Sequence, residues 1–89
     1  MKIVVNTCYG GFSLPETFCE KYEMDRYDNI SRTDERLINF VENFPNNCEF
    51  FCTQLEIVEI PDESTDWQID EYDGLESIIY VLNGKIHWE

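Results

Sequence analysis

The chain has 89 residues, so we expect residues 1–89 to form one compact acidic domain with a single modest core. Six Lys and Arg against nineteen Asp and Glu give a formal net charge of −13, which excludes a general electrostatic footprint on nucleic acid or on an anionic membrane. A hydrophobic content of 43%, with 15% aromatic residues, excludes a disordered chain in spite of that charge.

The first predicted strand covers residues 2–6, which are mostly aliphatic and β-branched. Gly10 and Gly11 then mark a turn. A helix is expected next, because Ser13 and Glu16 have the spacing of a capping box in which Ser13 is the N-cap. The apolar stripe of this helix is Leu14, Phe18 and Tyr22.

A second helix is predicted from a cap at Ser31 or Thr33 to a stop at Pro45. Asp34 and Glu35 near its start suit the positive end of a helix dipole. Its buried stripe is Leu37, Phe40, Val41 and Phe44.

The second half of the chain has the patterns of strands. Residues 55–60 alternate apolar and acidic side chains, and residues 67–72 are a weaker candidate. Residues 77–82 and 85–88 flank Asn83-Gly84, which favours a hairpin with a type I′ turn. The order β-α-α-β-(β)-β-β predicts an α+β fold, with two short helices packed on a mixed or mainly antiparallel sheet of four to five strands.

The cysteines Cys8, Cys19, Cys48 and Cys52 are interpreted as free thiols that pack as small apolar residues. Zinc is the alternative, but zinc modules pair their ligands closely twice, whereas here only Cys48 and Cys52 are close. We therefore expect no metal and no cofactor. No signal peptide or membrane span is predicted, which favours a cytoplasmic protein.

The turn between the first strand and the first helix is the candidate ligand site. Glycines there would let an anion approach the backbone amides, and the aromatic side chains would stack on a base. Arginines are nearly the only groups in this chain that could hold a phosphate. The predicted ligand-binding residues are Asn6, Thr7, Cys8, Tyr9, Gly10, Gly11, Phe12, Ser13, Arg26, Arg32, Arg36 and Tyr72. The alternative is a tight turn whose amides are occupied by Ser13 and Glu16, with the arginines paired to neighbouring acids.

A second candidate surface is acidic, since no Lys or Arg occurs from Leu37 to Gly84. It would bind a basic partner or mimic a polyanion, with aromatic anchors at Trp67 and Tyr72, or it would serve only for solubility. Its residues are Glu56, Glu59, Asp62, Glu63, Asp66, Trp67, Asp70, Glu71 and Asp73.

Catalysis is not predicted. His87 is the only histidine, so a nucleophile and base would have to be a cysteine such as Cys8 with His87, and residues 86–88 instead alternate as in an ordinary strand.

The opening residues Met1 to Leu14, the segment Leu55 to Asp62 and the segment Asp70 to Gly74 resemble a family of small, largely uncharacterised proteins of tailed phages, prophages and their bacterial hosts. The resemblance runs from the first residue to about Glu76. Members of that family often end in a His-Arg-x-Trp-like tail, and here His87 and Trp88 are kept but follow an Asn-Gly turn.

The resemblance implies counter-defence without an enzyme activity. Its first implied form is sequestration of a nucleotide-like immune signal through the glycine turn, in a pocket formed by a homo-oligomer. The other is an acidic inhibitor that binds a basic surface of a host defence protein.

Overall fold

The computed structural model describes residues 1–8, 11–45 and 54–89. The predicted α+β class and element order are confirmed, including the weaker strand candidate. The elements in chain order are β1 (Lys2–Asn6), α1 (Glu16–Tyr22), α2 (Glu35–Asn43), β2 (Leu55–Glu59), β3 (Asp66–Tyr72), β4 (Leu75–Leu82) and β5 (Lys85–Trp88). The strands form two antiparallel sheets rather than one: β1 pairs with β2, and β3, β4 and β5 form a three-stranded sheet.

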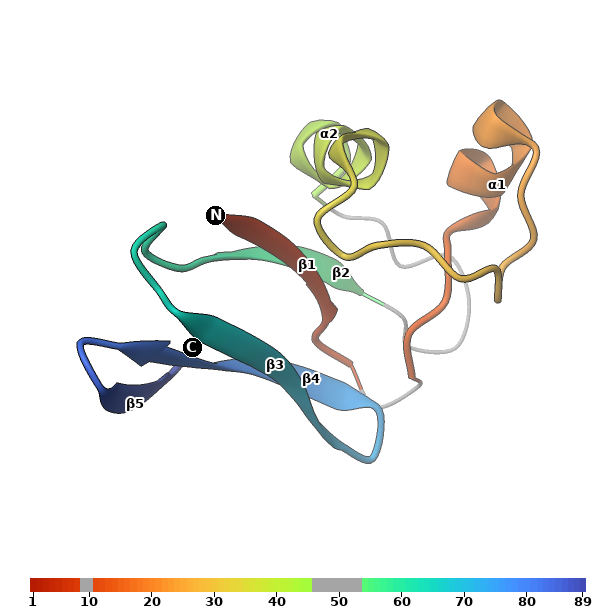
Figure 1. Ribbon diagram of the computed structural model, residues 1–89. Coiled ribbons are helices and arrows are strands. Elements are labelled where there is room, and N and C mark those ends of the chain that lie inside the picture. The colour runs from red at the N-terminus through yellow and green to blue at the C-terminus, as the bar shows by residue number, and fades with distance from the viewer. Residues whose placement is uncertain (9–10, 46–53) are drawn as a thin grey trace.

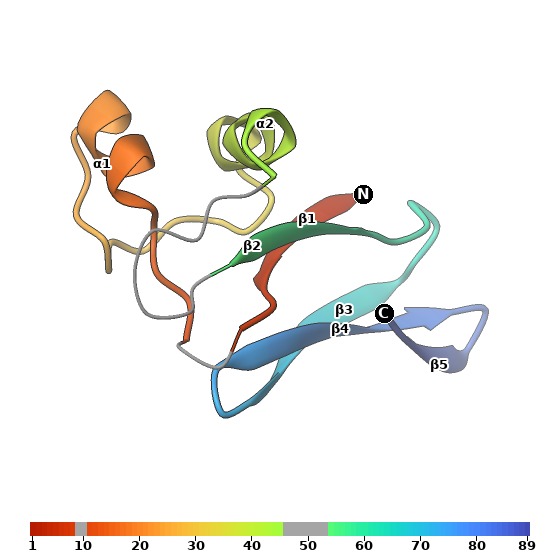
Figure 2. The same cartoon turned by 180° about the vertical axis from the view of Figure 1, so that it is seen from behind.

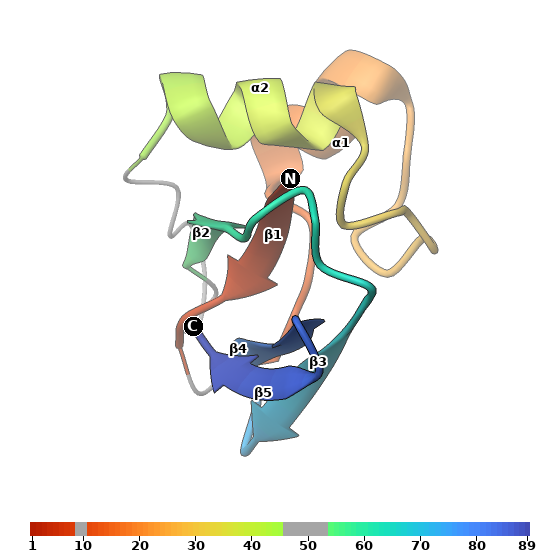
Figure 3. The same cartoon turned by 60° about the vertical axis from the view of Figure 1, so that its left-hand side comes forward.

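The elements are arranged in three layers, with the β1–β2 ladder in the middle (Figure 1). The helices lie on one side of this ladder and the three-stranded sheet lies on the other, as the reverse view also shows (Figure 2). Seen from a third direction, α2 lies above β1 and β2, with its axis running across the direction of β1 (Figure 3).

Strand β1 contributes to two cores because successive side chains of a strand point to opposite faces. Val4 packs in the core beneath the helices, whereas Ile3 and Val5 pack against the three-stranded sheet. The buried residues of the first core are Val4, Leu14, Phe18, Leu37, Phe40, Val41 and Leu55. Those of the second are Ile3, Val5, Ile60, Ile78 and Tyr80.

Both predicted helix caps are wrong. Helix α1 begins at Glu16 behind Pro15, an N-cap without a side-chain hydrogen bond, and Ser13 lies buried before it. The extended backbone of Pro15 (φ −60°, ψ 146°) separates Ser13 from the first helical turn. Helix α2 is capped by Asp34, whose Oδ1 accepts the Arg36 amide, while the hydroxyls of Ser31 and Thr33 bond to each other.

The predicted stripe of α2 is correct for Leu37, Phe40 and Val41 but wrong for Phe44, whose side chain is 52% exposed. The helix ends at Asn43, and Phe44 leaves the helical conformation (φ −129°, ψ 72°). Its ring therefore contacts Phe40 from outside the core.

The three-stranded sheet is built from two hairpins with two-residue turns. Asn83 and Gly84 both have positive φ (53° and 75°), which confirms the predicted type I′ turn. Asp73 and Gly74 have the same signs of φ, so β4 begins already at Leu75, opposite Tyr72.

Candidate functional site

The predicted ligand turn leaves β1 at Asn6, which is fully buried. Its Nδ2 donates to the carbonyls of Cys8 and Gly74, both at 2.7 Å, and its Oδ1 accepts the amides of Cys8 and Gln54. Every polar atom of this side chain is therefore used within the chain, and it fastens the turn to the β3–β4 hairpin.

Arg32 lies beside the same turn and carries an ion pair that sequence patterns did not reveal. Its Nη1 donates to Oε1 of Glu76 at 2.6 Å and its Nη2 to Oε2 at 3.0 Å. The guanidinium lies over the ring of Phe12, with Cζ 3.5 Å from the ring centroid. The side chains of Arg32 and Glu76 are 19% and 5% exposed, so the chain itself supplies the anion for this arginine.

The other two predicted arginines are also engaged. Arg26 donates from Nη2 to the Ser13 hydroxyl at 3.4 Å. Arg36 pairs with Asp34, its Nη2 2.9 Å from Oδ2, and its guanidinium lies over the ring of Tyr22. The structure thus places Arg26 and Arg32 against residues of the turn, whereas the contacts of Arg36 are with Asp34 and Tyr22.

Among the remaining predicted ligand-binding residues, Tyr9 and Gly10 lie outside the described residues. Gly11 has φ +84°, and no heavy atom lies within 4 Å of the position a Cβ would take. Thr7 donates its hydroxyl to the Gln54 carbonyl, and Tyr72 is 73% exposed near the β3–β4 turn. The nucleotide hypothesis stays a prediction.

The acidic candidate residues are exposed, but they are spread over β2, the loop that follows it and the β3–β4 hairpin. Asp62 pairs with the amine of Met1. The others form no ion pair with any residue in the described ranges: Glu56, Glu59, Glu63, Asp66, Asp70, Glu71 and Asp73.

Trp67 is not the outward anchor of this acidic surface. It is half-buried and packs against the second core together with Ile69, because β3 alternates. The opposite face of the same sheet carries Ile86 and Trp88, whose side chains are 69% and 62% exposed. The sequence predicted the alternation of Ile86, His87 and Trp88 in a strand, but not which side of the sheet Trp88 occupies.

We call this surface the outer face. It consists of the side chains that the three strands turn away from β1: Asp66, Gln68, Asp70, Tyr72, Leu75, Ser77, Ile79, Val81, Ile86 and Trp88. None of the elements in the described part of the chain covers it (Figure 1). It combines an apolar centre on β4 and β5 with carboxylates on β3.

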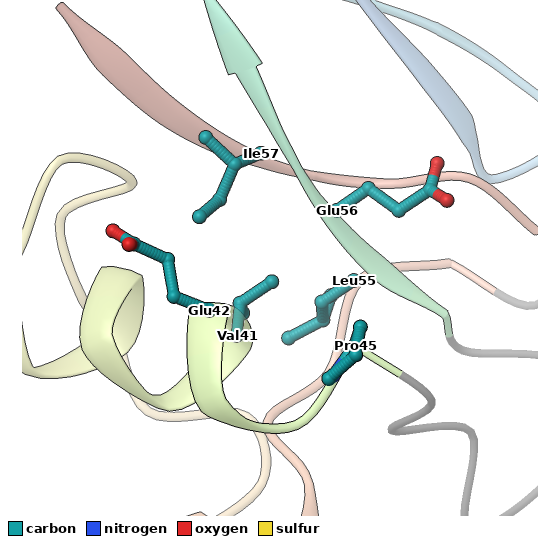
Figure 4. Close-up of a pocket in the computed structure, with 6 residues that line it drawn as sticks. All are labelled: Val41, Glu42, Pro45, Leu55, Glu56 and Ile57. Carbon is teal, nitrogen blue, oxygen red and sulfur yellow. The ribbon is translucent and has the colours of Figure 1, made fainter.

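A separate pocket of about 430 Å³ lies between the end of α2 and β2 (Figure 4). Val41, Leu55 and Ile57 form its apolar wall, and Glu42 already pairs with Lys2. Pro45 is the last described residue before 46–53, so the pocket borders a segment outside the described ranges.

Cys8 and Cys19 are half-buried, and the Cys19 thiol donates to the Leu14 carbonyl at 3.9 Å. Cys48 and Cys52 lie outside the described residues. His87 stacks on Tyr80, with 5.1 Å between ring centroids. Within the described ranges, no group of three His, Cys, Asp or Glu side chains is placed to hold a metal ion. Nothing in those ranges positively indicates catalysis.

No helix in the described part of the chain has the length and apolar character needed to cross a membrane. No protein-family model, curated protein or solved structure matches the chain. The resemblance to small phage proteins therefore stays a prediction.

Proposed function

We propose that the chain is a non-catalytic, cytoplasmic protein-binding domain whose acidic surface holds a basic surface of a partner protein. The observation that carries this proposal is the outer face, where exposed apolar side chains adjoin carboxylates without an ion pair among the described residues. Apolar anchors surrounded by charges of one sign suit an interface with a partner of opposite charge. In the setting implied by the phage resemblance, the partner would be a host defence protein.

Charge complementarity of this kind acts mainly on the rate of association. The segment from Asp66 to Glu89 contains one basic residue, Lys85, against six Asp and Glu residues, so its field attracts basic surfaces and repels acidic ones. Binding should weaken steeply as the Debye length falls from about 30 Å at 0.01 M salt to about 3 Å at 1 M.

The test uses lysozyme and cytochrome c as folded basic probes, with serum albumin as the acidic control. The variant Asp70→Asn/Glu71→Gln/Asp73→Asn removes one charge on the outer face and two beside it. A matched variant, Glu20→Gln/Glu23→Gln/Asp25→Asn, removes three exposed charges around α1.

We expect calorimetry at low salt to show binding of both basic probes, lost in the first variant and largely kept in the second. Absence of binding at low salt, or equal losses in the two variants, would refute the proposal. The sequence-based alternative of a nucleotide-like ligand at the glycine turn predicts protection by nucleotides that neither triple variant removes.

A further inference from the structure

The strand register of the outer face aligns its side chains in rows across the sheet. Directly paired residues of antiparallel strands lie on the same face, so Asp66, Val81 and Ile86 form one row. Gln68, Ile79 and Trp88 form the next row. In the first row, the Asp66 carboxylate on β3 is therefore next to Val81 on β4, and Ile86 on β5 lies on the far side of Val81.

A small cavity of about 150 Å³ opens at these two rows. Its lining combines apolar side chains of β4 and β5 with one carboxylate: Asp66, Trp67, Gln68, Ile79, Val81 and Ile86. A volume of this size holds a benzene-sized group, which corresponds to one side chain rather than a whole small-molecule ligand.

Asp66 is the only charged residue in this lining. Its Oδ1 accepts the amide of Trp67 at 2.9 Å, which fixes the carboxylate at the start of β3. Its Oδ2 has no partner among the described residues. An apolar wall of β4 and β5 next to one fixed carboxylate matches a side chain with an aliphatic stem and a cationic head.

We propose that this cavity holds one arginine or lysine side chain of the partner protein, with the stem on Val81 and Ile86 and the charged head at Asp66. This inference rests on the proposed function and names the anchor of that interface. A second copy of this chain is the other conceivable occupant. The outer face carries no cation to meet its own carboxylates, and two copies with a charge of −13 each would repel.

The experiment titrates the ¹⁵N-labelled full chain with the capped peptide acetyl-Ser-Gly-Arg-Gly-Ser-amide at low salt. Versions with lysine or citrulline at the centre distinguish the two cations and provide a neutral isostere of arginine. The amides of Gln68, Val81 and Ile86 should shift with the arginine peptide, the lysine peptide or both, and not with the citrulline peptide.

Two charge-matched variants of β3 locate the site. Asp66→Asn removes the carboxylate of the cavity, and Asp70→Asn removes one on the same face, about 13 Å further along the strand. We expect Asp66→Asn to raise the peptide Kd about fivefold and Asp70→Asn to raise it less than about twofold. The exposed variant Ile86→Ser should also weaken binding, because it removes the support for the stem.

Equal effects of Asp66→Asn and Asp70→Asn, or equal shifts with the citrulline peptide, would overturn the inference. If the basic proteins still bind the wild-type chain under those results, the proposed function stands without this anchor. If the basic proteins do not bind either, both proposals fail. Dimerisation through the outer face, detected by light scattering and abolished by Trp88→Ser, would also overturn the inference in favour of a second copy.

Discussion

Arg32 and Glu76 form a two-point ion pair that joins the loop before α2 to β4, with both nitrogen–oxygen distances at or below 3.0 Å. Oε1 of Glu76 also accepts the amide of Asn6 at 2.8 Å, and Nη1 of Arg32 donates to the Val4 carbonyl. One carboxylate thus links the end of β1, the loop and the three-stranded sheet. Arg32, which lies beside the glycine turn, consequently has a structural role.

Removing the carboxylate of Glu76 should destabilise the fold strongly, because the Arg32 guanidinium and the Asn6 amide lose their acceptor. We expect Glu76→Ala to lower the free energy of unfolding by about 3–5 kcal/mol, measured by urea denaturation. If this variant does not fold, Glu76→Gln keeps an acceptor for Asn6 and should show a smaller loss. Glu59→Gln, an exposed control, should stay within about 0.5 kcal/mol of the wild type. A loss for Glu76→Gln no larger than that of the control contradicts the assigned role.

Asn6 connects three segments, and its truncation would leave buried groups without partners. Asn6→Ala removes acceptors or donors for Cys8, Gln54 and the Gly74 carbonyl. We expect the free energy of unfolding to fall by about 1–3 kcal/mol. Hydrogen exchange should also accelerate at Gln54, whose amide loses its acceptor. Unchanged protection at Gln54 would show that Asn6 does not fasten this segment.

Asp34 should make the stability of α2 depend on pH. Its side-chain hydrogen bond with Arg36 lowers the pKa of this carboxyl below its ordinary value of 3.8. Because the folded-state pKa is the lower one, the stabilisation is present above about pH 4 and is lost as the pH falls through the lowered pKa. Asp34→Ala should cost about 1 kcal/mol at pH 7 through loss of the cap. Asp34→Asn should keep most of the cap but remove the part of the pH dependence of stability that comes from the Asp34 carboxyl. Thermal unfolding between pH 2 and 7 measures this dependence. An acid-induced loss of stability equal to that of the wild type would argue against this assignment.

Gly11 is required by its backbone conformation and not by crowding. Its φ of +84° is unfavourable for other residues, while the space at its Cβ position is open. We expect Gly11→Ala to lower the free energy of unfolding by about 1 kcal/mol. Gly84→Ala, at φ +75° with equally open space, is the matched control and should behave alike. A much larger loss at Gly11 would reveal close contacts around the turn. If nucleotides protect the wild-type chain in a thermal-shift screen, the same variant shows whether they bind at this turn.

The sequence determined the elements whose signals are local. The β-branched run of β1, the Asn83-Gly84 turn and the apolar spacing of α2 each restrict backbone angles or bury one face within a few residues. The element order and the α+β class follow from these signals. The cap of α2 was assigned wrongly because Ser31, Thr33 and Asp34 can all act as caps. The cap of α1 was wrong because the helix begins only after the extended Pro15, which has no capping side chain.

Only the tertiary structure decided which surfaces are free. The separation of the strands into two sheets, the pairing of Arg32 with Glu76 and the inward side of Trp67 all depend on contacts between distant segments. In a strand, a shift of the register by one residue exchanges the buried and exposed faces, so alternation alone could not assign Trp67 or Trp88 to a side. Local residue patterns determined the elements of this protein, whereas the packing of β1 between two layers decided that Arg32 is neutralised by Glu76 and that the outer face is exposed.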